Sequence, residues 1–149
     1  MFKIETNSHE DSYELGRRLG ELASPGIFIS LNGDLGAGKT VLAKGIGDGL
    51  EIDENITSPT FVIIQVYPNG RAPLAHADLY RLTSSEELIE LGIEDLLNDH
   101  VFAMEWADRC PEVVPQDHLS VTIEHLEEGC RLVTIEAFGG RHQAYLERC

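Results

Sequence analysis

Basic residues are scarce in this chain. Eleven lysines and arginines stand against 26 aspartates and glutamates, which gives a formal net charge of −15 at pH 7, and Arg17 and Arg18 are the only adjacent basic pair. Proteins that bind a nucleic-acid backbone neutralise many phosphates with such residues. We therefore expect no strong direct binding of duplex nucleic acid or tRNA, and the charge instead favours docking on a basic surface of a partner protein.

Long apolar runs and paired cysteines are missing as well. No stretch approaches the roughly 18 apolar residues of a membrane span, and the first residues, MFKIETNSHED, hold no apolar signal-peptide segment. Cys110, Cys130 and Cys149 are odd in number and widely spaced, which fits neither a disulfide framework nor a C-x-x-C metal motif. We expect a cytoplasmic protein with free thiols and no membrane segment.

The 149 residues suffice for one core, and no linker or repeat divides them, so we expect a single domain over residues 1–149. Apolar and alternating runs predict strands at about residues 2–6, 27–31, 61–67, 73–80, 101–106, 119–125 and 131–138. Capping signals and helical periodicity predict helices at about residues 8–23, 39–50, 84–98 and 141–147. Turn residues at 68–70 and 127–129 predict two hairpins. This order indicates a mixed α/β sheet flanked by helices.

The segment LNGDLGAGKT, residues 31–40, carries a phosphate-binding pattern, Gly33-x-x-x-x-Gly38-Lys39-Thr40. A predicted strand precedes it and a predicted helix follows, which is the context that such a loop requires. The glycines let successive N–H groups point at phosphate oxygens, Lys39 supplies a cation for the β- and γ-phosphates, and Thr40 supplies a hydroxyl for Mg²⁺. The predicted nucleotide-binding residues are Gly33, Asp34, Leu35, Gly36, Ala37, Gly38, Lys39 and Thr40. The motif predicts a three-layer α/β P-loop NTPase fold, with a mostly parallel central sheet, antiparallel hairpins and helices on both faces.

A magnesium site of this kind needs an acid at the end of a neighbouring strand, and two residues qualify. Glu105 ends a run that follows a predicted helix, so its strand can lie parallel and next to the loop strand. Asp78 ends the 73–80 run inside a predicted hairpin and is better suited to orienting the attacking water or to an outer contact. Since apolar runs often end in an acid without function, the pattern leaves a structural role open for either residue.

Two further segments contribute candidates. Hydroxyls surround Pro59 where nucleotide hydrolases carry a switch segment, although an ordinary loop has a similar composition. The predicted switch residues are Ser58, Pro59, Thr60 and Phe61. The segment HADLYRL, residues 76–82, places more polar residues on one strand than a plain sheet requires: His76, Asp78, Tyr80 and Arg81. The single tryptophan, Trp106, is interpreted from the pattern alone as a core or interface residue.

These segments together resemble the TsaE family, formerly called YjeE. The matching motifs, in order and spacing, are LNGDLGAGKT (31–40), SPTF (58–61), HADLYRL (76–82), ELGIEDLL (90–97) and EW (105–106). The resemblance implies a small bacterial ATPase that binds ATP with Mg²⁺ and hydrolyses it weakly alone. It further implies action with TsaD and TsaB, the pair that makes threonylcarbamoyladenosine (t6A) at adenosine 37 of tRNA.

The resemblance also implies residue roles. Residues 33–40 would hold the phosphates, Thr40 and Glu105 would hold Mg²⁺, and Lys39 and Asp78 would serve hydrolysis, with residues 58–61 as the switch. His76, Tyr80, Arg81 and Trp106 would position the nucleotide or contact a partner, and Thr6 would lie near adenine. The chain lacks Asn-Lys-x-Asp, which leaves guanine specificity of the small-GTPase kind unsupported. Two alternatives stay open: a small-molecule or nucleoside kinase, and a nucleotide switch that does not hydrolyse.

Overall fold

The computed structural model describes residues 2–34, 38–57, 63–127 and 129–149. Within these ranges the strands are β1 (Phe2–Thr6), β2 (Phe28–Gly33), β3 (Ile64–Tyr67), β4 (Leu74–Asp78), β5 (Val101–Glu105), β6 (His118–His125) and β7 (Arg131–Phe138). The α-helices are α1 (His9–Leu22), α2 (Lys39–Gly49), α3 (Glu86–Glu90), α4 (Ile93–Asp99) and α5 (Gly140–Arg148), with 3₁₀ turns η1 (Ala107–Arg109) and η2 (Pro111–Val113). The predicted strands and both hairpins are confirmed in the part of the chain that is described.

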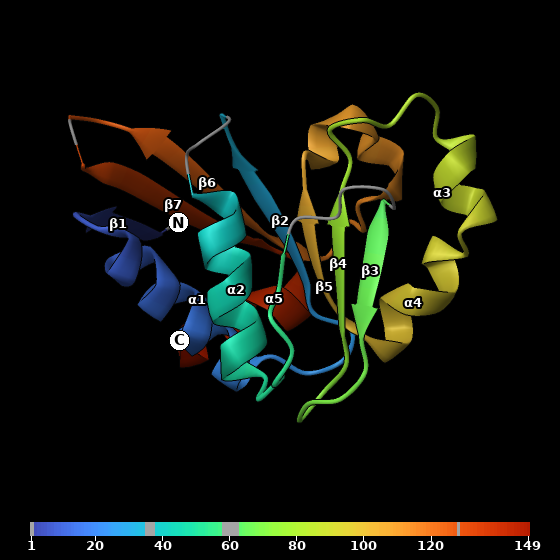
Figure 1. The fold of residues 1–149 in the computed structure, drawn as a ribbon, viewed down its shortest axis with the longest axis horizontal. Helices are drawn as coiled ribbons and strands as arrows, with labels where there is room; N and C mark the ends of the chain where they lie inside the picture. Colours follow the sequence, from blue (N-terminus) through green and yellow to red (C-terminus); the bar gives the residue numbers. More distant parts are fainter. Residues whose placement is uncertain (1, 35–37, 58–62, 128) are drawn as a thin grey trace.

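The described strands form one sheet in the order β1-β7-β6-β2-β5-β4-β3. The central strands β6, β2, β5 and β4 are parallel to one another, whereas β7 and β3 pair antiparallel with β6 and β4 at the two sides, and β1 pairs antiparallel with β7. Because β2, β4 and β5 run in the same direction, their carboxyl ends meet at one edge of the sheet (Figure 1). This edge is where a P-loop site is expected.

The sheet separates two apolar cores, as the alternation of side chains along its strands requires. Leu31, Leu74 and Ala103 point to the core shared with α1, α2 and α5. Phe28 and Phe102 point to the opposite core, and their rings stack there with centroids 5.2 Å apart, under α3 and α4. Strands β3 to β5 thus lie between α2 on one side and α3 and α4 on the other (Figure 1). The predicted three-layer α/β architecture is confirmed.

Helix α2, which follows the loop, contains Gly45, Gly47 and Gly49 and is intrinsically weak. Gly45 and Gly49 lie against α1: a Cβ built on Gly45 would clash with the carbonyl oxygen of Tyr13, and one on Gly49 with that of Arg17, whereas Gly47 faces the side chain of Ile56. The two helix backbones therefore approach so closely that only glycine fits between them. This packing fixes the helix that carries Lys39 and Thr40.

The helix predicted at residues 84–98 is divided, which corrects the sequence-based expectation. Gly92 adopts a left-handed conformation (φ +73°), and the chain forms α3 before it and α4 after it. The predicted cap at Ser84 is not formed: α3 begins after Ser85, whose side chain makes no capping hydrogen bond, and the carboxylate of Glu87 instead accepts the N–H of Thr83 at 3.2 Å. Glycine interrupts helical periodicity without a change in the apolar pattern, so the pattern alone did not indicate the break.

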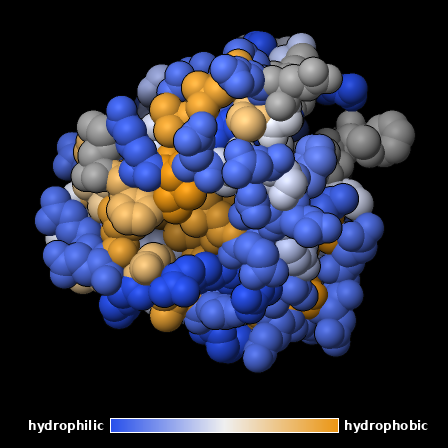
Figure 2. Space-filling view, turned by 90° about the vertical axis from the view of Figure 1, so that its left-hand side faces the viewer, coloured by the Kyte–Doolittle hydropathy of each residue, from blue (hydrophilic) through white to orange (hydrophobic). Residues whose placement is uncertain are grey.

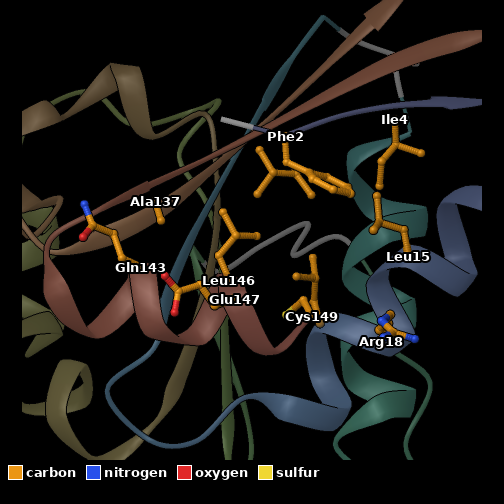
Figure 3. Close-up of a pocket in the computed structure, with 11 residues that line it drawn as sticks. Phe2, Ile4, Leu15, Arg18, Ala137, Gln143, Leu146, Glu147 and Cys149 are labelled. Atoms are coloured by element: carbon orange, nitrogen blue, oxygen red, sulfur yellow. The ribbon is translucent and has the colours of Figure 1, made fainter.

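An apolar hollow of about 650 Å³ opens on the face that carries β1 and α1. Figure 2 shows the apolar side chains that gather there, and Figure 3 shows that they come from β1, β7, α1 and α5. Its lining residues are Phe2, Ile4, Leu15, Arg18, Leu19, Ile135, Ala137, Gln143, Leu146, Glu147 and Cys149. None of them belongs to the predicted nucleotide site. No helix within the described ranges has the length and apolarity that a membrane crossing requires.

Candidate nucleotide site

The loop between β2 and α2 begins and ends with glycines in unusual backbone conformations. Gly33 closes β2 with φ +148°, and Gly38 precedes α2 with φ +108°, in the region that side chains disfavour. The N–H groups of the first turn of α2 therefore stand at the end of the loop, where a helix N-terminus favours anions. The intervening predicted residues, Leu35, Gly36 and Ala37, lie outside the described residues, and Asp34 is exposed beside them.

Lys39 is the first residue of α2, and its side chain is buried. Its Nζ donates to the carbonyl oxygen of Gly33 at 2.5 Å and to that of Asp34 at 3.4 Å. Burial lowers the pKa of Lys39 below its ordinary value, and the carboxylates of Glu105 and Asp78 oppose this shift by favouring the charged form. The ammonium group is thus held by loop carbonyls, which are weaker acceptors than a phosphate would be.

Thr40 and Glu105 meet at the carboxyl edge of the sheet. Glu105 ends β5 and pairs in register with Leu31 of β2 on one side and with Asp78 of β4 on the other. The Oγ1 of Thr40 donates to Oε1 of Glu105 at 3.5 Å. Of the two acids considered from the sequence, Glu105 is therefore the one whose carboxylate contacts Thr40.

These two oxygens fit the requirements of a magnesium ion. Mg²⁺ prefers hard oxygen ligands and, in triphosphate sites, takes only one or two from the protein and the rest from phosphates and water. A hydroxyl and a carboxylate oxygen 3.5 Å apart are such a pair. No group of three or more His, Cys, Asp and Glu side chains gathers as a metal site within the described ranges. Thr40 and Glu105 are the residues that would hold the ion.

Asp78 ends β4 and is half-buried at the same edge. Its Oδ1 accepts the N–H of Tyr80 at 3.0 Å, which directs the carboxylate back over its own turn. Burial raises the pKa of Asp78 above its ordinary value, partly offset by the hydrogen bond from Tyr80. A carboxylate with a raised pKa beside a phosphate site is a suitable group to orient or polarise a water molecule.

His76 lies two residues before Asp78 and faces the same side of the sheet. Its Nε2 lies 2.7 Å from Oε2 of Glu105, and both side chains are buried. From sequence, His76 was expected to position the nucleotide or contact a partner, and its pairing with Glu105 was not foreseen. The two residues are 29 positions apart, so only the strand register brings them together.

Trp106 follows Glu105 in a left-handed backbone conformation (φ +59°), which is rare for a bulky residue. Its indole ring lies under Lys39, whose Nζ is 3.7 Å from the ring centroid. The ring of Tyr80 packs at 51° against it with centroids 5.1 Å apart, and the guanidinium of Arg109 lies 5.4 Å from the centroid of the Tyr80 ring. Arg81 is exposed next to this cluster. Sequence reasoning missed Arg109, which no motif marks.

Thr6 is buried at the end of β1, and its Oγ1 accepts a hydrogen bond of 3.5 Å from Ser12. It pairs in register with Arg131, whose Nε lies 4.0 Å from the position that a Cβ on Gly38 would occupy. Thr6 therefore stands on the strand pair beside the loop, although its side chain faces α1. The predicted switch residues Ser58, Pro59, Thr60 and Phe61 lie outside the described residues.

Known proteins share the fold and much of the sequence of this chain. The crystal structure of Bacillus subtilis YdiB superimposes with a TM-score of 0.84 and 33% identity, covering 99% of this chain and 92% of that one. The Nostoc protein named tRNA threonylcarbamoyladenosine biosynthesis protein TsaE is 43% identical over 93% of this chain and 87% of its own length. A Bacillus subtilis protein of the same name is 36% identical over 99% of this chain and 92% of its own length.

The family described as "Threonylcarbamoyl adenosine biosynthesis protein TsaE" matches residues 6–133, a range that contains the loop, both acids and the aromatic cluster. The fold, the motifs and the relatives agree over nearly the whole chain. The chain belongs to the TsaE family.

Proposed function

We propose that this protein is a Mg²⁺-dependent ATPase that acts in the cytoplasm with TsaD and TsaB in the biosynthesis of t6A on tRNA. The observation that carries the proposal is the convergence of Lys39, Thr40, Glu105 and Asp78 at the carboxyl edge of three parallel strands. A cation, two hard oxygens and a half-buried carboxylate at one helix N-terminus suit the hydrolysis of a triphosphate.

Each residue has a distinct part in this reaction. Lys39 exchanges the carbonyl oxygens of Gly33 and Asp34 for phosphate oxygens and neutralises charge that develops on them. Mg²⁺, when held by Thr40 and Glu105, supplies further neutralisation of the phosphate charge. Asp78 orients the attacking water. Its carboxylate lies at the same carboxyl edge of the sheet as Glu105, and its hydrogen bond is to the N–H of Tyr80 and not to Lys39. No covalent intermediate on the protein is needed.

The biosynthetic role is supported by the relatives. Members of the family that cover this chain almost end to end carry names that place them in t6A biosynthesis. The net charge of −15 fits a protein that leaves contact with tRNA to its partners.

Phosphate release from ATP by the purified protein, alone and with TsaD and TsaB, tests the proposal. Slow release alone that rises with both partners and disappears in Lys39→Ala is expected. Lys44→Ala, which removes a lysine from the same helix outside the loop, should match the wild type. Turnover that ignores the partners would remove the t6A role, and release only in the presence of a phosphoryl acceptor would favour a kinase. Binding without turnover in the full complex would favour a switch.

A further inference from the structure

The two carboxylate oxygens of Glu105 take part in two different hydrogen bonds. Oε2 accepts from Nε2 of His76 at 2.7 Å, and Oε1 accepts from Oγ1 of Thr40 at 3.5 Å. Because Thr40 is the other residue that fits Mg²⁺, Oε1 is the oxygen that faces the proposed ion. The bond to His76 holds Oε2 on the inner side and thereby determines which oxygen is presented.

The backbone fixes this arrangement. Asp78 pairs with Glu105 across β4 and β5, and His76 precedes Asp78 by two residues, so His76 and Glu105 leave the sheet on the face that α2 covers. The side chain of His76 is 0% exposed and that of Glu105 is 3% exposed. Because both side chains are almost completely buried, water competes little for hydrogen bonds to the carboxylate. The orientation of the Glu105 carboxylate therefore depends on the protein donors around it.

Of the two ring nitrogens of His76, Nε2 makes the hydrogen bond to Glu105. Nδ1 of His76 is buried and has no hydrogen-bond partner among the described residues. An ionised carboxylate only accepts, so Nε2 carries the hydrogen of this bond.

From these contacts we infer that His76 is a positioning residue for magnesium: it acts through Glu105 and touches neither the ion nor the nucleotide. The inference rests on the proposed Mg²⁺-ATP function and deepens it. Residues that hydrogen-bond a metal ligand typically change metal affinity by about 10–100-fold when they are lost. The loss of His76 therefore affects the magnesium requirement and leaves metal-free nucleotide binding intact.

Two amide variants of different reach test this inference. His76→Gln brings an amide nitrogen close to the position of Nε2 and keeps a donor for Glu105. His76→Asn is one methylene shorter and ends near the position of Nδ1, so it loses that donor while staying polar and uncharged. His142→Gln is the matched control, because His142 is also buried and bonded to a carboxylate, Asp117, but contacts Phe28 at the opposite end of β2 from the loop.

The readout is the affinity for ATP, measured by calorimetry in EDTA and at increasing Mg²⁺ concentrations. In His76→Asn the Mg²⁺ concentration that gives half of the full tightening should rise about tenfold or more, with affinity in EDTA within about twofold of wild type. His76→Gln and His142→Gln should stay close to wild type in both. A wild-type magnesium requirement in His76→Asn, or an equal loss of affinity with and without Mg²⁺, would overturn the inference. Absence of ATP binding by the wild type would instead contradict the proposed function, and the inference with it.

Nitrogen NMR of the wild-type imidazoles provides a second test that needs no variant. The expected spectrum shows a hydrogen on Nε2 of His76. Its Nε2 resonance should move when Mg²⁺ and ADP are added together and stay in place with ADP in EDTA. An Nε2 that carries no hydrogen, or equal movement in both conditions, would overturn the inference.

Discussion

The Nζ of Lys39 lies 3.7 Å from the centroid of the Trp106 ring, in cation–π contact. The same Nζ donates to the carbonyl oxygen of Gly33 at 2.5 Å. Both contacts attract a cation less strongly than a phosphate does, so nucleotide binding should draw Lys39 away from the ring. Trp106 is the single tryptophan of the chain, so all tryptophan emission comes from this ring. Its fluorescence should therefore change when the Lys39 ammonium group moves away from it.

The first prediction concerns this fluorescence. Addition of ATP with Mg²⁺ should change the emission of Trp106, because the cation over its ring moves to the phosphates. Lys39→Ala should abolish the change and weaken ATP binding by about tenfold or more, since a charge-assisted hydrogen bond is worth about 1.5–3 kcal/mol. A fluorescence titration of both proteins, with calorimetry for the affinity, checks both points.

Lys44→Ala serves as the control, since Lys44 lies on the same helix but outside the loop. It should give the wild-type emission change and affinity. If Lys39→Ala still shows the full emission change at saturating ATP, the signal does not come from the Lys39 and Trp106 contact, and the interpretation fails.

The second prediction concerns Asp78. Asp78→Asn keeps an oxygen that accepts the N–H of Tyr80 and removes the charge. Because a positioned carboxylate contributes about a hundredfold or more to proton transfer, hydrolysis should fall by at least that factor, while ATP affinity stays within about threefold. Phosphate-release kinetics and calorimetry separate the two effects. Equal loss of binding and hydrolysis would instead assign Asp78 to nucleotide binding.

The pH dependence follows from the environment of the same residue. Burial raises the pKa of Asp78 above its ordinary value of 3.8, so the ionised form needed for hydrolysis is lost at a higher pH than for an exposed aspartate. Wild-type turnover should fall as pH is lowered through that raised pKa, and the residual turnover of Asp78→Asn should lack this limb. The raised pKa also means that the ionised carboxylate lowers stability at neutral pH, so the melting temperature of Asp78→Asn should be equal or higher.

The third prediction concerns the packing of α1 on α2. In Gly45→Ala the new methyl group would clash with the carbonyl oxygen of Tyr13, which belongs to rigid helical backbone. Overpacking of this kind costs about 1–3 kcal/mol or more, which exceeds the gain of about 1 kcal/mol in helix propensity. Urea denaturation should show a clear loss of stability. Gly140→Ala, in α5 with nothing within 4 Å of the new Cβ, should be neutral or slightly stabilising; equal effects of both changes would exclude the packing explanation.

The loop and its supporting strand and helix could be predicted from the sequence because their signals are local. The apolar run before Gly33, the glycines and the Lys39-Thr40 pair all lie within one short segment. The side of the sheet on which Asp78 falls also follows from simple alternation along a strand. These features depend on residues that are close together in the sequence. Such local patterns can be recognised from a single sequence.

The contacts that complete the site could not be predicted in the same way. The pairing of His76 with Glu105 depends on the register of β4 against β5, which is set by long-range packing. Trp106 was interpreted as a packing residue, and its left-handed backbone, which turns the ring under Lys39, has no signature in the residue type. The break at Gly92 likewise depends on a backbone conformation that glycine permits but does not require.

A second buried histidine ties α5 to the sheet. Nε2 of His142 accepts the N–H of Phe28 at 2.9 Å, and its Nδ1 lies 2.5 Å from Oδ1 of Asp117. Burial lowers the pKa of His142 and outweighs the opposite effect of Asp117, while the hydrogen bond from His142 lowers the pKa of Asp117. Nε2 can accept from Phe28 only while the ring is neutral, so protonation breaks this contact.

The fourth prediction is a loss of stability in mild acid that depends on His142. Its pKa in the folded protein is lowered below the ordinary value of 6.5, so the unfolded chain binds the proton more readily, and the stabilisation is complete above pH 6.5 and lost as pH falls from there to the folded pKa. The contribution of Asp117, whose folded pKa lies below 3.8, persists until more acidic pH. Urea midpoints at about pH 7.5 and 5.5 should therefore fall less in His142→Gln than in wild type. His9→Gln, which changes an exposed histidine at the start of α1, should fall as much as wild type, and an equal fall in all three proteins would show that other groups carry the acid sensitivity.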